Sequence, residues 1–187
     1  MRTMSIDEWV AKLERASSRS LPGEIRKAMI IGALTAERRS KTQATSAPRA
    51  RTGHLRRSIK AVARGVGLDS EIRLSANTPY AGVQEHGGTI LPKKGKYLTI
   101  PLGAAKTAAG VSRKGARDYP DLFFIMSKAG KPLLVRKSGD GIEPMFLLVT
   151  SSRVPARPYL APGIEAARKD LPFLIGAAFR RAVSIDG

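Results

Sequence analysis

The stretch that decides the fold of this chain is Pro79-Tyr80-Ala81-Gly82-Val83-Gln84-Glu85-His86-Gly87-Gly88-Thr89. It combines an aromatic residue, a step of small residues, a Glu-His pair and a Gly-Gly pair. Two short motifs accompany it: Thr52-Gly53-His54-Leu55-Arg56-Arg57-Ser58-Ile59 upstream and Val154-Pro155-Ala156-Arg157-Pro158-Tyr159-Leu160 downstream. We interpret the three motifs as a structural framework and not as a catalytic site.

Each motif contains residues with a simple physical role. Gly53 permits a sharp turn into a strand, and Gly87-Gly88 permits a bend at a strand end where another backbone approaches closely. Tyr80 can bury its ring while its hydroxyl finds a polar partner. Arg157 stands between two prolines, which presents its guanidinium rigidly to a carboxylate across an interface. The alternative for Arg157 is an ordinary exposed arginine.

Outward from the motifs, the N-terminal part of the chain (1–47) is predicted to be helical. Ser5 and Glu8 have the spacing of a capping box, in which each side chain satisfies a free amide of the first turn. Pro22 is expected to restart a helix after the first one. Apolar residues follow at helical spacing, first Ile6, Trp9, Val10 and Leu13, then a narrow stripe of Ile25, Ala28, Met29, Gly32, Ala33 and Ala36.

The middle of the chain (52–150) changes to a two-residue period, which is typical of half-buried strands. Turn-forming residues separate the segments. The strands are expected at 59–66, 71–75, 97–102, 122–126, 133–135 and 145–149. A helix returns at 163–185, where Pro172 predicts a new N-terminus or a kink.

This order predicts an α+β fold. We expect a single domain, 1–187, with an antiparallel sheet of hairpins, on which a long N-terminal helix and a C-terminal helix pack. The segment 103–120 shows no periodicity and has four basic residues against one acidic residue. It is expected to be a long basic loop, either flexible or ordered on a partner.

Composition bounds the function. The chain has 187 residues, 33 Lys and Arg against 15 Asp and Glu, and a net charge of +18. Such an excess favours polyanions or acidic partner surfaces, or else serves only as a solubilising surface. There are no cysteines, so disulfides and thiolate chemistry are excluded. Without an apolar run of about 20 residues, we expect a soluble cytoplasmic product and no membrane partner.

Catalytic patterns are missing from the sequence. The two histidines, His54 and His86, lie far apart, and neighbours such as Glu85 and His86 would point to opposite faces of a strand. We find no His-Glu-x-x-His motif and no glycine-rich phosphate loop. We therefore expect no enzyme and no catalytic, cofactor-binding or metal-binding residues. An enzyme is retained only if Glu85 and His86 share a cleft with a shifted pKa.

Nucleic-acid binding is the stronger alternative. Basic residues cluster from the end of the N-terminal helices into the next segment, at Arg38, Arg39, Lys41, Arg49, Arg51, Arg56 and Arg57. No zinc-finger spacing, basic zipper or aromatic RNA-binding strand accompanies them. Any contact with DNA is therefore expected to involve phosphates and to carry no sequence information.

Taken in order, the three motifs resemble those of the tail-completion and head–tail connector (neck) proteins of long-tailed bacteriophages, including minor tail and virion-morphogenesis proteins. The shared pattern is a long N-terminal helix, Thr-Gly-x-Leu-x-x-Ser-Ile, a strand that ends in Tyr-Ala-x-x-x-Glu/His-x-Gly, and Pro-x-Arg-Pro-Phe/Tyr-Leu before a C-terminal helix. The pattern spans most of this chain.

The resemblance implies a structural virion protein, assembled in the bacterial cytoplasm, that forms a ring in the neck. The expected partners are copies of itself, with a hexamer as first choice, the tail tube protein, the head-completion or connector protein, and passing DNA without specificity. We expect the basic segment between Lys93 and Arg117 to dock on acidic neighbours or to line the DNA passage, and we favour docking. The expected interface residues are Arg56, Arg57, Tyr80, Glu85, His86, Lys93, Lys94, Lys106, Arg113, Lys114, Arg117, Arg157 and Tyr159.

Overall fold

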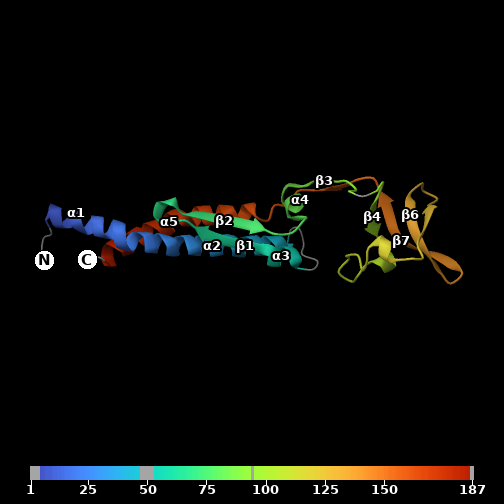
Figure 1. Ribbon diagram of the computed structural model, residues 1–187, viewed down its shortest axis with the longest axis horizontal. Coiled ribbons are helices and arrows are strands. Elements are labelled where there is room, and N and C mark those ends of the chain that lie inside the picture. Colours follow the sequence, from blue (N-terminus) through green and yellow to red (C-terminus); the bar gives the residue numbers. More distant parts are fainter. Residues whose placement is uncertain (1–4, 47–52, 94, 186–187) are drawn as a thin grey trace. The chain divides into compact units, whose positions relative to one another are not determined.

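The computed structural model describes residues 5–46, 53–93 and 95–185 of the chain. The chain divides into two compact units, one containing Met1–Ala81 and Arg157–Gly187 and the other containing Gly82–Ala156. The first unit holds the long helices, and the second holds the larger sheet (Figure 1).

The first unit consists of two long helical segments and a β-hairpin that packs along them (Figure 1). In chain order its elements are α1 (Ile6–Arg15), a π-helical turn (Ala16–Ser20), α2 (Leu21–Ser46), α3 (His54–Ser58), β1 (Ile59–Arg64), a 3₁₀ turn (Gly67–Asp69), β2 (Glu71–Ala76) and α5 (Ala161–Ile185).

The N-terminal helices follow one another without a break. The capping box is confirmed, since Ser5 Oγ accepts from the Glu8 amide at 3.2 Å and the Ser5 amide donates to Glu8 Oε2 at 2.9 Å. A helix begins again at Leu21 with Pro22 in its first turn, as the sequence predicts, although a π turn joins α1 to α2 without a break. In that turn the Leu21 amide donates to the Ala16 carbonyl. This wider turn accommodates Pro22, which has no amide hydrogen and follows directly after it.

Helices α2 and α5 run antiparallel and lie close together. The small-residue stripe of α2 is buried, as expected. A Cβ added at Gly32 would lie 3.2 Å from Leu171 Cδ2 of α5, and one added at Gly163 would overlap Ser40 Oγ and lie 2.5 Å from the Ala36 carbonyl oxygen. Glycine at these two positions therefore allows the two helices to come this close.

The hairpin β1–β2 covers one side of this helix pair. Its antiparallel register pairs Ala61 with Leu74 and Ala63 with Ile72, so the inward side chains alternate with exposed ones. Ala63 and Ile72 pack against the α2–α5 core. The amide of Ala61 donates to Glu37 Oε2 on α2 at 2.9 Å, which ties the strand to the helix.

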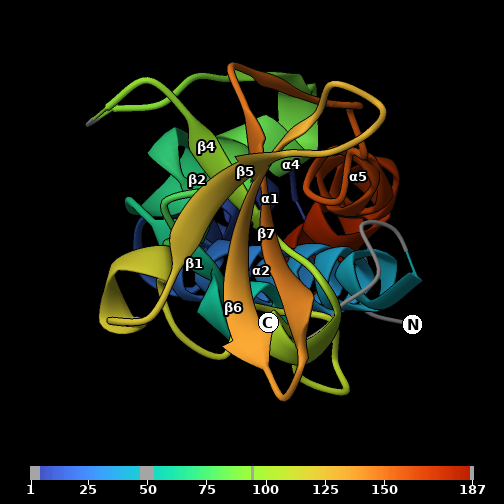
Figure 2. The same ribbon diagram turned by 90° about the vertical axis from the view of Figure 1, so that its right-hand side faces the viewer.

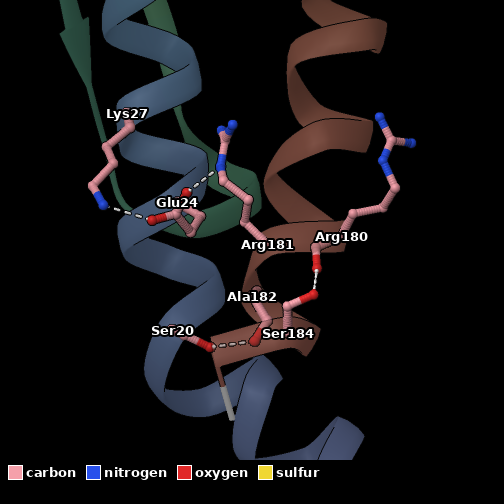
Figure 3. A network of polar contacts seen from close by, with 7 residues as sticks. All are labelled: Ser20, Glu24, Lys27, Arg180, Arg181, Ala182 and Ser184. Atoms are coloured by element: carbon pink, nitrogen blue, oxygen red, sulfur yellow. Dashed lines mark hydrogen bonds and ion pairs between the residues drawn. The ribbon is translucent and has the colours of Figure 1, made fainter. Parts of the chain in front are cut away.

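A buried carboxylate links α2 to the last turns of α5 (Figure 3). Glu24 is 4% exposed. Its two oxygens accept from Lys27 Nζ at 2.6 Å and from Arg181 Nε at 2.7 Å. One turn away, Ser20 Oγ donates to the Ala182 carbonyl at 3.2 Å. These contacts place the end of α5 beside the π turn.

Pro172 does not end the C-terminal helix. Helix α5 runs from Ala161 to Ile185 with Pro172 inside it, although the sequence predicts a new start or a kink there. Pro172 is exposed. Because proline has no amide hydrogen, the Arg168 carbonyl has no helical hydrogen-bond donor. It lies on the exposed side of the helix, where water can donate to it instead.

The second unit contains two antiparallel sheets (Figure 2). The larger has the strand order β4-β7-β6-β5 and the smaller pairs β3 with β8. Its elements are most of α4 (Ala81–His86), then β3 (Gly88–Ile90), β4 (Leu98–Pro101), β5 (Phe123–Met126), β6 (Pro132–Ser138), β7 (Gly141–Val149) and β8 (Ser152–Val154).

The basic segment 103–120 is folded onto the larger sheet. It has 3₁₀ turns at Gly103–Ala105 and Ala116–Asp118, and Ala105 is fully buried against Met145 and Phe146. The Tyr119 ring meets Phe146 edge-on, with centroids 5.8 Å apart. The segment supplies part of the core of this unit, so it differs from both sequence expectations, a flexible loop and an arm that is ordered only on a partner.

The α+β class is confirmed: a long N-terminal helix and a C-terminal helix accompany antiparallel strands. The finer expectation of one sheet in one domain differs from the structure, in which the described strands form three separate sheets and the chain divides into two compact units. The reason is that each unit encloses apolar clusters of its own. Periodicity identifies strands but does not assign them to one sheet.

We expect Gly163→Ala to lower the free energy of unfolding of the first unit by about 2–3 kcal/mol, because the new methyl group overpacks the α2–α5 crossing. Circular dichroism at 222 nm during urea unfolding measures this, since the long helices belong to that unit. The matched control is Ser40→Ala. Ser40 Oγ is buried with no hydrogen-bond partner among the described residues, so its removal should cost nothing or stabilise by up to about 1 kcal/mol. A harmless Gly163→Ala would contradict the close crossing.

We expect the first unit to become less stable as the pH is lowered through the acid range. Hydrogen bonds from Lys27 and Arg181 lower the pKa of Glu24 below its ordinary value of 4.5. Burial alone would raise the pKa of Glu37, but hydrogen bonds from Lys41 and the Ala61 amide outweigh it and the pKa is lowered. Both carboxylates therefore stabilise the fold above pH 4.5, and this contribution is lost as pH falls through the lowered pKa values.

Thermal unfolding followed from pH 7 to pH 3 tests this dependence. The double variant Glu24→Gln/Glu37→Gln should be less stable than the parent at pH 7 and should depend less on pH. An equally steep acid dependence in the double variant would rule out these two groups as its source.

Candidate interaction site

The three sequence motifs converge on one buried cluster of the first unit. Leu55 and Ile59 come from the upstream motif, Ala81 comes from the central one and Tyr159 from the downstream one. Ala44 from the end of α2 completes the buried set. Segments more than 70 residues apart in sequence therefore meet in one core, as Ala81 and Tyr159 do.

The upstream motif folds as a tight helical turn that leads straight into β1. Gly53 has φ +69°, a left-handed conformation that favours glycine. Its carbonyl accepts from the Arg57 amide at 3.0 Å, which begins α3. Ser58 Oγ donates to the Leu55 carbonyl at 2.8 Å and closes the turn. Thr52 lies outside the described residues.

Tyr159 belongs to the core and not to an interface. It is fully buried, and its hydroxyl donates to the Ala81 carbonyl at 3.3 Å. The sequence predicts this arrangement for the wrong tyrosine, because Tyr80 is 40% exposed. The position after Pro158 explains the difference, since that segment leads into α5 and carries Tyr159 under the end of α2.

The central motif continues as a helix and not as a strand. Ala81–His86 form α4, in which Glu85 is 7% exposed and His86 is exposed at the last turn. Consecutive residues of a helix point about 100° apart, so α4 turns one side chain inward and the other to solvent. The two side chains therefore do not face a common cleft.

Gly87 makes the close approach that the sequence predicts. It has φ +71°, and a Cβ there would lie 2.7 Å from the Ala156 nitrogen and 3.1 Å from the Val154 carbonyl oxygen. The smaller sheet begins at once after it, with Gly88 paired to Val154. The Gly-Gly pair thus lets β3 lie directly beside β8.

The cations expected at interfaces are mostly on the surface of their units. Arg56, Arg57 and Arg157 are exposed in the first unit. In the second unit Lys106 is half-buried, and the rest of the described set is exposed: Lys93, Arg113, Lys114 and Arg117. Lys94 lies outside the described residues.

The basic side chains of segment 103–120 are held on a shaped backbone. An isolated antiparallel β-bridge pairs the backbone of Lys106 with that of Ser112. The Nε of Arg113 donates to the Lys106 carbonyl at 2.8 Å. Asp118 Oδ2 accepts from the Gly115 amide at 2.9 Å and orders the turn between the cations. The arrangement presents positive charge from a folded surface, which costs less ordering on binding than a flexible arm would.

Two features of the surface do not emerge from the motifs. Helix α1 has no buried residue, so its apolar stripe is open to solvent. On α2, Ile30, Ile31 and Leu34 are 44–49% exposed on the side opposite the buried stripe. The sequence signal for the second feature is the run Met29-Ile30-Ile31, which places large aliphatic side chains on both sides of one helix.

No family model, curated protein sequence or solved structure matches this chain. In the part of the chain that the structure describes, no helix is long and apolar enough to span a membrane. The same residues contain no group of three or more His, Asp or Glu side chains placed to hold a metal ion.

We expect Tyr159 to behave as a core residue. Tyr159→Ala should lower the free energy of unfolding by about 3–5 kcal/mol, and Tyr159→Phe, which loses only the hydroxyl, by about 1 kcal/mol. The exposed neighbour Arg157→Ala is the control and should change it by no more than about 0.5 kcal/mol. Urea unfolding followed at 222 nm measures all three. A Tyr159→Ala variant as stable as the parent would contradict the core assignment.

Proposed function

We propose that this chain is a structural virion protein of a long-tailed bacteriophage. It forms a ring in the neck, as a tail-completion or tail-terminator protein, and joins the tail tube to the capsid connector. The observation that carries the proposal is the convergence of the three motifs on one core. The residues that resemble the neck proteins are those that build this framework.

The charge distribution supports a role in binding protein surfaces. The chain has a net charge of +18, and segment 103–120 holds exposed cations on a folded backbone. Arg56, Arg57 and Arg157 add exposed guanidinium groups around the motif core. Arginine suits bidentate binding to carboxylates, so acidic surfaces of the tail tube or connector protein are the proposed partners.

A DNA-binding accessory protein is the second candidate. Arg38, Arg39, Arg56 and Arg57 are all exposed in the first unit. They could neutralise phosphates without reading sequence. This candidate predicts tight binding to any duplex and a steep loss of affinity with salt.

We expect the quadruple variant with Lys106, Arg113, Lys114 and Arg117 changed to Gln to assemble into rings but to lose head–tail joining. Negative-stain microscopy with isolated tails and capsids measures joining, and light scattering measures assembly. The matched control changes Arg64, Arg73, Arg168 and Lys169 to Gln. These four cations are exposed in the first unit and belong to none of the proposed contacts, so their loss removes the same charge and should leave joining intact.

The first variant and a further one also separate the candidates. Normal joining by the first variant would contradict the proposed docking role of segment 103–120. If the parent ignores tails and binds duplex DNA, and a further variant with Arg38, Arg39, Arg56 and Arg57 changed to Gln flattens the dependence of log affinity on log salt by about 0.9 per lost phosphate contact, the DNA-binding candidate replaces the neck protein.

A further inference from the structure

Among the described residues of its own unit, none covers the apolar stripe of α1. Ile6 is 83% exposed, and Trp9, Val10 and Leu13 are 40–48% exposed. The helix has an intact capping box at its start. It is therefore a well-formed amphipathic helix that leaves its apolar side in water, and such a side usually marks an interaction surface.

The π turn explains why this stripe is uncovered. A π turn adds about one residue to the helical register, which brings Ile6, Val10 and Leu13 onto the side that α2 buries against α5. Helix α5, however, ends beside the π turn, where Ala182 accepts a hydrogen bond from Ser20, and α1 extends beyond it (Figure 1). The apolar stripe of α1 therefore continues the side of α2 that packs on α5, beyond the point where α5 ends.

A complementary surface lies on the outward side of α2. Ile30, Ile31 and Leu34 form an exposed aliphatic patch there. Lys27 and Arg38 flank the patch at either end, since residues 27, 31, 34 and 38 share one side of a helix. Both cations are exposed.

The charges of the two surfaces are opposite. Helix α1 has three carboxylates against two cations within a chain of net charge +18. Asp7 and Glu14 lie one heptad apart along one border of the apolar stripe, so both can face the basic border of the α2 patch. Pairing of α1 with another α1 in antiparallel fashion would instead set Asp7 against Glu14 of the other copy, which like-charge repulsion disfavours.

We propose that α1 of one copy docks on the Ile30–Ile31–Leu34 patch of α2 in a second copy. A chain cannot make this contact with itself, because α1 and α2 are consecutive parts of one continuous helical segment. The contact joins two different surfaces. Repeated head-to-tail from copy to copy, such a contact builds a ring where the rotation closes and an open filament where it does not. This inference rests on the proposed ring and names the contact that would build it.

Trp9 provides the readout, since it is the only tryptophan of the chain and lies in the stripe. On docking, its emission should shift to shorter wavelength as the protein concentration rises, together with growth in the scattering mass. Leu34→Asp should abolish both changes without loss of helical signal, because Leu34 is half exposed. Val62→Asp, which alters an equally exposed aliphatic residue on the outer face of β1, is the matched control and should behave as the parent.

Mixing two variants decides whether the contact is head-to-tail. The Leu34→Asp variant keeps its α1, and the Ile6→Ser/Leu13→Ser variant keeps its α2 patch. Each alone should be monomeric, and the mixture should give a single one-to-one complex with the blue-shifted Trp9 emission. Self-association of the Leu34→Asp variant, or no complex in the mixture, would overturn the proposal.

The same measurements separate this inference from the proposed function, because they need neither tails nor capsids. If the two variants form a one-to-one complex but the parent protein never joins heads to tails, the contact between copies holds and the neck role is refuted. A parent that stays monomeric, and whose Trp9 emission shifts only when tails are added, would overturn the contact between copies.

Discussion

The close antiparallel packing of α2 on α5 is the constraint on which the first unit depends. Gly163 is essential to it, because a Cβ there would overlap Ser40 and lie 2.5 Å from the Ala36 carbonyl oxygen of α2. Gly32 is also tight, since a Cβ there would lie 2.9 Å from Ile72 Cδ1 of β2 and 3.2 Å from Leu171 Cδ2 of α5. The hairpin β1–β2 rests on the surface that this pair creates, and the cluster of the three motifs forms at one end of it. At the other end, the Glu24–Arg181 pair and the Ser20–Ala182 hydrogen bond hold the last turns of α5 (Figure 3). Without this packing, the motif residues would have no common core to occupy.

The sequence predicts these elements well where side-chain periodicity decides them. The buried stripe of α2, the capping box at Ser5 and the strands around Ile72 and Ile100 follow from local spacing, and the structure agrees. The α+β class follows from their order. The sequence fails where the result depends on long-range packing. Segment 103–120 has no period, yet Ala105 is buried because the sheet of the second unit offers it a matching surface.

The candidate site shows the same division. Glycine roles follow from backbone geometry, so the close approach at Gly87 could be predicted. Which tyrosine is buried does not follow from the sequence, which favours Tyr80 for that role, whereas the structure buries Tyr159. The pattern around Glu85 and His86 is too short to separate a strand from one and a half turns of helix. Glu85 is buried and His86 is exposed. This difference arises only from the packed structure.

Charge and apolar exposure act together in this molecule. A chain of net charge +18 repels its own copies at long range, so assembly needs contacts that are locally attractive. Helix α1 supplies one, because its excess of carboxylates borders an exposed apolar stripe. The exposed aliphatic patch of α2, flanked by Lys27 and Arg38, has the opposite character. Salt would weaken both the general repulsion and this local attraction, so self-association should depend on salt far less steeply than the binding of the basic surfaces to an acidic partner.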